Sequence, residues 1–283
     1  MSERTRILVA SDIHLCHLDW YGTKNDDQVQ RFTADVEEEC RRDPAEALLL
    51  LGDYSLDYWA WNIKGCWINE GVSQTERFVR TYMDRLRRAA GEIRMIAGNH
   101  EQYGHALWKE KTGFSRQDIL LCGGVLFLLL DTYGADLDPD HHSDGTYCGA
   151  DVEFIRTKMA EIPDVPVILC AHHLDPERES AQFCELVKND HRILCLFSGH
   201  VHRSQVQYPP EFGGKPLAWT GHYSYSGEKP DPLVCGRGMR ELILTNESLV
   251  SRYIAEENDY ILNGETVHLS RSIQDEFTLR FTE

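Results

Sequence analysis

Two histidines, two positions apart, follow an apolar run in the second half of the chain. Residues 193–197 have the composition of a buried strand, but the sequence continues as Ser-Gly-His-Val-His, which places His200 and His202 directly after the run. Imidazole is a frequent ligand of divalent metals and can act as a general acid or base near neutral pH. The significance of this ending depends on whether other strands end in the same way.

Four other short apolar runs are also followed by polar residues of these kinds. The runs span residues 6–10, 47–51, 93–97 and 165–170. The polar residues after the five runs are Asp12, His14, Asp53, Asn99, His100, His172, His173, His200 and His202. Carboxylate, imidazole and amide groups without sulfur suit a hard to borderline divalent ion. The pattern therefore predicts a metal site built from the ends of several strands.

Local backbone patterns agree with this interpretation. Residues i and i+2 of an extended segment project to the same side, so we expect Asp12 and His14, and likewise both histidines of the GHVH segment, to face one cavity. Glycine precedes Asp53, Asn99 and His200. We expect a sharp exit from each strand to need a residue without a Cβ atom at these points.

The elements that must position these residues follow an α/β pattern. Apolar residues recur at helical spacing in segments that lie between several of the runs. The predicted helices are residues 25–42, 74–90, 150–161 and 177–189. In such domains ligand-binding residues gather at the carboxyl ends of the strands. Apolar and polar residues alternate in 204–208, 241–245 and 249–257, which predicts an antiparallel section.

Composition limits the class of protein. The chain has 283 residues and a net charge of −17, from 29 Lys and Arg against 46 Asp and Glu. A general nucleic-acid binder needs a basic face, so none is expected, whereas bound cations would still let an acidic protein bind a small phosphorylated substrate. We predict one domain over residues 1–262, with a tail of residues 263–283 packed on the same domain.

The cysteines and the apolar runs indicate the cellular compartment in which the protein is expected. There are nine cysteines without a CxxC pair, and Cys170 and Cys195 lie within apolar runs, as buried reduced cysteines do. The opening MSERTR precedes only a short apolar run, and no run approaches the length that spans a bilayer. We therefore expect a cytoplasmic protein that does not contact membranes. The sequence does not indicate an oligomeric state.

Five segments together resemble the signature blocks of the calcineurin-like metallophosphoesterases. In chain order they are Asp12-Ile13-His14, Gly52-Asp53, Gly98-Asn99-His100-Glu101, His172 and Gly199-His200-Val201-His202. Each block is weak alone, but all five in family order at predicted strand ends form a specific pattern. The resemblance implies an α/β fold in which two mixed sheets form a β-sandwich flanked by helices.

The resemblance also implies a centre with two divalent ions, which could be manganese, iron or zinc. The ligands of one ion would be Asp12, His14 and His202. Those of the other would be Asn99, His172 and His200. Asp53 would bridge the two ions, and His100 would contact the substrate phosphate and protonate the leaving oxygen. We assign His172 rather than His173 to the fourth block and keep His173 as a second-sphere or pocket residue.

The reaction implied by the resemblance is phosphoester hydrolysis by a hydroxide that bridges two metals. Phosphoprotein phosphatases resemble GDxxDRG and RGNHE, whereas this chain reads GDYSLDYW and AGNHE, without those phosphate-binding arginines. With less positive charge to meet a dianionic monoester, we expect a small-molecule phosphodiesterase. A phosphomonoesterase and a catalytically silent metal-binding scaffold are the alternatives. Trp59, Trp61 and Trp67 would either line the substrate site or pack peripherally.

Overall fold

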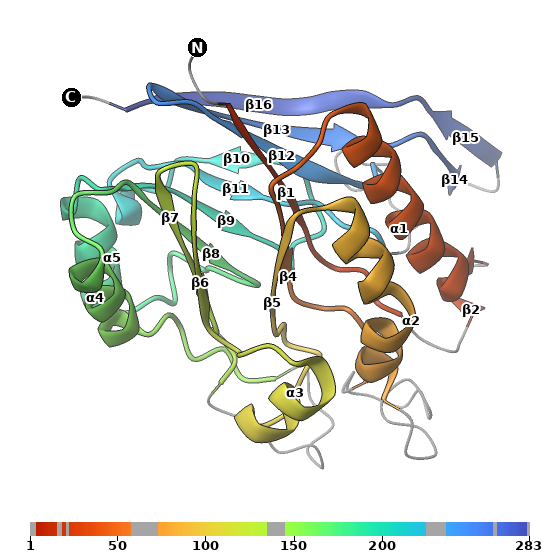
Figure 1. The fold of residues 1–283 in the computed structure, drawn as a ribbon, viewed down its shortest axis with the longest axis horizontal. Coiled ribbons are helices and arrows are strands. Elements are labelled where there is room, and N and C mark those ends of the chain that lie inside the picture. Colours follow the sequence, from red (N-terminus) through yellow and green to blue (C-terminus); the bar gives the residue numbers. More distant parts are fainter. Residues whose placement is uncertain are drawn as a thin grey trace.

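The framework of the protein is a pair of six-stranded sheets (Figure 1). The structure is a computed structural model that describes residues 4–15, 19–20, 23–57, 73–134, 145–224, 236–262 and 265–281. The first sheet has the order β16 (Ser272–Arg280), β13 (Ser248–Ala255), β12 (Gly238–Leu244), β1 (Thr5–Ala10), β4 (Ala47–Leu51) and β5 (Glu92–Ile96). The second has the order β10 (Val206–Gln207), β11 (Leu217–Trp219), β9 (Ile193–Ser198), β8 (Val167–Ala171), β7 (Val125–Leu130) and β6 (Asp118–Cys122).

Each sheet combines parallel and antiparallel neighbours. β1, β4 and β5 run parallel, while β12 pairs antiparallel with β1. In the second sheet β7, β8, β9 and β11 run parallel, and β6 and β10 join antiparallel at the edges. The predicted sandwich of two mixed sheets is confirmed.

The strands appear as continuous apolar runs in the sequence because both of their faces are covered. In β1, Ile7 and Val9 face the core between the sheets, where Phe127 and Ile168 of the second sheet also lie. The alternate residue Leu8 faces outward, into the core formed with the helices. Side-chain alternation along each strand therefore contributes to two hydrophobic cores.

Helices cover the outer faces of both sheets, as Figure 1 shows. The described helices are α1 (Asn25–Arg42), α2 (Gln74–Ala89), α3 (His105–Thr112), α4 (Val152–Glu161), α5 (Ala181–Asn189) and the short 3-10 helix η2 (Pro210–Phe212). α1 and α2 pack on the first sheet, and α4 and α5 pack on the second. α5 begins after residue 177, the predicted start, because the Ser180 hydroxyl accepts a hydrogen bond from the Phe183 N–H and caps the helix there.

The C-terminal residues contribute to the same framework. β14 (Asn258–Leu262) and β15 (Glu265–Leu269) form a hairpin, and β16 then pairs antiparallel with β13 at the edge of the first sheet. The short strands β2 (Asp19–Trp20) and β3 (Thr23–Lys24) form a second hairpin. The domain boundary at residue 262 stays a prediction. No helix in the described part of the chain is long and apolar enough to cross a bilayer.

Candidate metal centre

The segments that follow β1, β4, β5, β8 and β9 bring the predicted ligands together where the two sheets meet. Asp53 lies at the centre of the group: its Oδ2 atom is 3.2 Å from His14 Nε2, 3.2 Å from His172 Nε2 and 3.6 Å from His100 Nε2. The His100 N–H donates to the other oxygen of this carboxylate at 3.1 Å. One buried carboxylate thus contacts side chains that come from both sheets.

The remaining predicted ligands lie on two sides of Asp53. On one side, Asp12 Oδ1 is 3.2 Å from His202 Nε2 and 3.9 Å from His14 Nε2. On the other side, Asn99 Oδ1 is 2.8 Å from His172 Nε2 and 3.0 Å from His200 Nδ1. This arrangement places every side chain predicted to hold a metal within one buried to partly buried cluster.

The chemistry of the facing atoms calls for a cation between them. His172 Nδ1 lies 2.7 Å from the Leu51 carbonyl oxygen, which only accepts, so Nδ1 carries the proton and the lone pair of Nε2 faces the Asp53 and Asn99 oxygens. Burial disfavours the charged imidazolium, yet the Asp53 carboxylate outweighs it and raises the pKa of His172 to about 9, so the site favours positive charge at Nε2, where a metal ion would replace the proton. Oxygen and imidazole nitrogen in this arrangement fit a borderline divalent ion.

Carboxylate and imidazole atoms form three overlapping groups whose ligand atoms lie within 4.8 Å of one another. The groups are Asp12, His14 and His202; His14, Asp53 and His100; and Asp53, His172 and His200. Asp53 and His14 each belong to two of them, and of these two only Asp53 has a second carboxylate oxygen with which to bridge. His100 lies close enough to share a group with a predicted ligand, although the sequence analysis gives it a role toward substrate.

The backbone of these residues is not extended, contrary to the reasoning from the sequence. Five predicted ligands have left-handed backbone angles: φ is 57° at Asp12, 55° at His14, 57° at Asp53, 67° at His200 and 55° at His202. Such angles are uncommon for residues with a side chain and concentrate at functional sites. Asp12 and His14 do face one cavity, but a left-handed turn after the strand, rather than strand alternation, directs them there.

Glycine is required at two positions because neighbouring atoms lie too close for a Cβ atom, as well as because the chain turns there. Gly52 has a φ of 90°, and a Cβ atom there would lie 2.7 Å from the Gly98 Cα. A Cβ atom at Gly98 would lie 2.1 Å from Asp53 Oδ1, although the φ of Gly98 is ordinary. The predicted need for a residue without Cβ is therefore correct at both positions, but at Gly98 the reason is contact with the Asp53 carboxylate.

Glu101 holds these two loops together, a role that the sequence analysis does not assign. Its Oε2 atom accepts from the Asp53 and Gly98 N–H groups, both at 2.8 Å. Its Oε1 atom accepts from the Tyr54 N–H at 2.9 Å and the Ser55 N–H at 3.3 Å. The carboxylate is fully buried. The signal in the sequence was the position of Glu101 within the GNHE segment.

A sequence profile of calcineurin-like phosphoesterases matches residues 5–204. The chain belongs to the calcineurin-like phosphoesterase family. Its cofactors as a member are two divalent metals, and the clusters around Asp53 are able to hold such ions. The fold and family expected from the sequence blocks are thus confirmed, while the role of each residue stays a prediction. No curated protein matches the chain in sequence.

Solved structures of other proteins share the fold of this calcineurin-like phosphoesterase. A dimetal phosphatase from Danio rerio aligns with a TM-score of 0.66 at 11% identity, over 98% of this chain and 99% of that one. A purple acid phosphatase from yellow lupin seeds aligns with a TM-score of 0.62 at 15% identity, over 99% of this chain and 54% of that one. GAP50, described as the anchor in the inner membrane complex of Plasmodium, aligns with a TM-score of 0.56 at 12% identity, over 95% of this chain and 89% of that one.

Two further histidines of this calcineurin-like phosphoesterase lie against predicted ligands. His173 stacks on His200, with ring centroids 4.2 Å apart, and its Nδ1 atom lies 2.9 Å from the Tyr133 hydroxyl. His222 is buried and stacks on His202 at 5.3 Å. The role of His173 as a second-sphere or pocket residue stays a prediction, and His222 matches none of the sequence blocks. Trp59, Trp61 and Trp67 lie outside the described residues.

Removing the Tyr133 hydroxyl is expected to reduce turnover moderately. Tyr133→Phe deletes the hydrogen bond that orients His173 beneath His200, which is worth about 1 kcal/mol, so kcat/KM should fall by about three- to tenfold while metal content stays constant. Tyr147→Phe is the matched control, because that hydroxyl donates to Glu179 and accepts from the Asp175 N–H but is not bonded to His173. Equal effects of the two variants, or loss of metal from Tyr133→Phe, would contradict this role.

Proposed function

We propose that this protein is a metal-dependent phosphoester hydrolase that acts on a small-molecule phosphodiester. The observation that carries the proposal is the convergence on Asp53 Oδ2 of imidazoles from His14, His100 and His172. Carboxylate and imidazole groups that face one another in this way fit a pair of divalent ions. Manganese, iron and zinc all suit this set of ligands. Such ions, when bound, activate water and offset negative charge on the phosphoryl oxygens.

Each residue has a proposed role in this centre. Asp53 would be shared by both metals. The other proposed ligands are Asp12, His14 and His202 for one metal, and Asn99, His172 and His200 for the other. The hydrogen bond that the His172 Nδ1–H donates to the Leu51 carbonyl keeps Nε2 directed at the metal site. Asp12 Oδ2 accepts from the His200 N–H at 2.9 Å, which fixes the segment that carries His200 and His202.

His100 is proposed to act on the substrate rather than only on the metals. Its main-chain N–H is bonded to Asp53 Oδ1, so the residue is anchored beside the centre, and its Nε2 atom lies 3.6 Å from Asp53 Oδ2. In its protonated form the imidazole can donate a hydrogen bond to a phosphoryl oxygen and then its proton to the departing oxygen. His100 would thus neutralise charge that develops on the leaving group.

The preference for a diester is supported by the charges around the centre. In the described part of the chain, neither Asp12 nor Asp53 forms a salt bridge with lysine or arginine; their partners are histidines. A phosphomonoester dianion carries one more negative charge than a diester and gains more from a nearby guanidinium. A site that relies on metals and imidazoles alone therefore suits the diester.

Chelation is expected to remove activity, and metal to restore it. Protein dialysed against a chelator should hydrolyse bis-(p-nitrophenyl) phosphate at least ~100-fold more slowly, because the metals supply several kcal/mol of transition-state stabilisation. Addition of Mn²⁺, Fe²⁺ or Zn²⁺, each tested separately with its stoichiometry measured, should restore turnover. The same assay with p-nitrophenyl phosphate tests the preference, and a higher kcat/KM for this monoester would overturn the diester assignment. Protein that binds two metals but hydrolyses neither ester would instead be a scaffold.

A further inference from the structure

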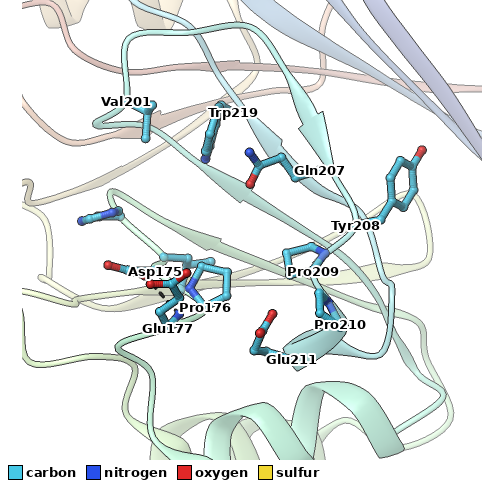
Figure 2. Close-up of a pocket in the computed structure, with 12 residues that line it drawn as sticks. Asp175, Pro176, Glu177, Val201, Gln207, Tyr208, Pro209, Pro210, Glu211 and Trp219 are labelled. Carbon is cyan, nitrogen blue, oxygen red and sulfur yellow. Dashed lines mark hydrogen bonds between the residues drawn. The ribbon is translucent and has the colours of Figure 1, made fainter.

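A cavity of about 540 Å³ lies beside the proposed metal centre, between the segment after β8 and the strands β10 and β11. Figure 2 shows Asp175 and Glu177 on one side of this space, with Gln207 and Trp219 across from them on the strand side and Glu211 below. We call it the side cavity. Its volume is within the range of pockets that bind small ligands.

The side cavity is continuous with residues that touch the proposed ligands. His173, which stacks on His200, and Val201, which lies between His200 and His202 in the chain, both line it. Trp219 pairs with Ser198 in the parallel register of β11 and β9, so it sits next to the segment that leads to these histidines. A substrate whose phosphate lies at the metals can therefore place one ester substituent in this space.

The lining of the side cavity is acidic and partly aromatic. Asp175, Glu177 and Glu211 bring three carboxyl groups to the cavity, and neither lysine nor arginine is among the described residues that line it. Within the described residues none of the three forms a salt bridge, so their charges remain available to a ligand. The aromatic ring of Trp219 forms part of the wall, and Tyr208, with 59% of its surface exposed, lies at the rim.

We propose that the side cavity binds a cationic, ammonium-bearing ester substituent of the substrate, an assignment that rests on the proposed phosphodiesterase function. Carboxylates attract the positive charge, and the faces of tryptophan and tyrosine bind weakly hydrated ammonium groups through cation–π interactions. The same carboxylates repel an anionic substituent, and no cation in the lining would offset that repulsion. A zwitterionic phosphodiester suits both halves of the site: its phosphate meets the metals and its ammonium group meets the carboxylates.

The test compares two substrates that differ only in this charge. p-Nitrophenyl phosphocholine carries a trimethylammonium group, and p-nitrophenyl 3,3-dimethylbutyl phosphate carries a neutral tert-butyl group of the same shape. With metal-loaded protein, kcat/KM should be about tenfold higher for the cationic ester, as expected for an ammonium group held by aromatic and acidic side chains. The ratio of the two values does not depend on the fraction of protein that is loaded with metal.

Variants then assign the preference to the side cavity. Glu177→Gln and Glu211→Gln are each expected to lower the ratio about threefold, and the double variant should lower it further. Glu185→Gln removes one charge from the exposed face of α5, outside the cavity lining, and should leave the ratio unchanged. A ratio near one in the unmodified protein, or an equal effect of Glu185→Gln, would overturn the proposal.

A binding measurement separates this inference from the proposed function. Tetramethylammonium, followed by line broadening of its proton NMR signal, should bind the metal-loaded protein and bind several-fold more weakly to the Glu177→Gln, Glu211→Gln double variant. Binding of this kind without hydrolysis of either ester would sustain the side cavity and refute the phosphodiesterase assignment. Hydrolysis of both esters without discrimination, and without tetramethylammonium binding, would sustain the phosphodiesterase and refute the cation site.

Discussion

Asp53→Asn is expected to lower kcat/KM on a phosphodiester by about 10³-fold, equivalent to about 4 kcal/mol of transition-state stabilisation, and to reduce the metal content. The substitution keeps the shape of the side chain but removes the charge proposed to be shared by both metals. Asp53 Oδ1 accepts from the His100 N–H, so the asparagine oxygen will keep that position. Its NH₂ group then faces His14 and His172, where Asp53 Oδ2 now lies 3.2 Å from each ring nitrogen.

The measurement is metal stoichiometry together with steady-state kinetics on bis-(p-nitrophenyl) phosphate. Asp84→Asn is a matched control, because the Asp84 side chain is 81% exposed and pairs at the surface with Arg87 on α2. It should retain both metals and full activity. If Asp53→Asn bound two metals and turned over like the control, Asp53 would lie outside the reactive centre and the proposed function would lose its main support.

The framework of the fold was predictable because its strands are covered on both faces. β4 and β8 are apolar throughout and β1, β5 and β9 are mostly apolar, so these strands stand out in the sequence, and α1 occupies the residues that the helical periodicity indicated. β7 was missed, although VLFLLL is a run of the same kind, since no histidine or glycine follows it. At its end Asp131 instead pairs with the buried Arg116, which precedes β6, a contact that periodicity does not reveal.

The site was predictable in its members but not in its geometry. Motif order brought Asp12, His14 and Asp53 to attention, yet their left-handed backbone follows from loop contacts such as the hydrogen bond from the Ile13 N–H to the Asp53 carbonyl. His222 matches no motif, and its stacking on His202 depends on tertiary structure. The side cavity is likewise formed by segments far apart in the chain. Such contacts between remote residues leave no periodic signal in a single sequence.

Glu101→Gln is expected to destabilise the protein by about 4 kcal/mol, because each oxygen of Glu101 accepts from two main-chain N–H groups. An amide offers one oxygen and one NH₂ group. In either orientation the NH₂ group meets two N–H donors, which are left without an acceptor in a fully buried site at about 1–3 kcal/mol each. Because these donors belong to the segments that carry Asp53 and Asn99, kcat/KM should also fall by more than about tenfold.

The protonation state of Glu101 decides the outcome. Burial and the negative charge of Asp53 raise the pKa of Glu101 to about 8, while the N–H donors lower it, so the full loss is expected where the carboxylate is ionised: above that pH, or with cations at Asp53 that offset the repulsion. Chemical denaturation of metal-loaded protein measures the effect. The control is Glu153→Gln on the exposed surface of α4, whose free energy of unfolding should lie within about 0.5 kcal/mol of the parent's. A loss below about 1 kcal/mol for Glu101→Gln would mean that Glu101 is protonated in the folded protein, since a neutral amide would then replace a neutral acid. Glu101 would then not hold the two loops together as an anion.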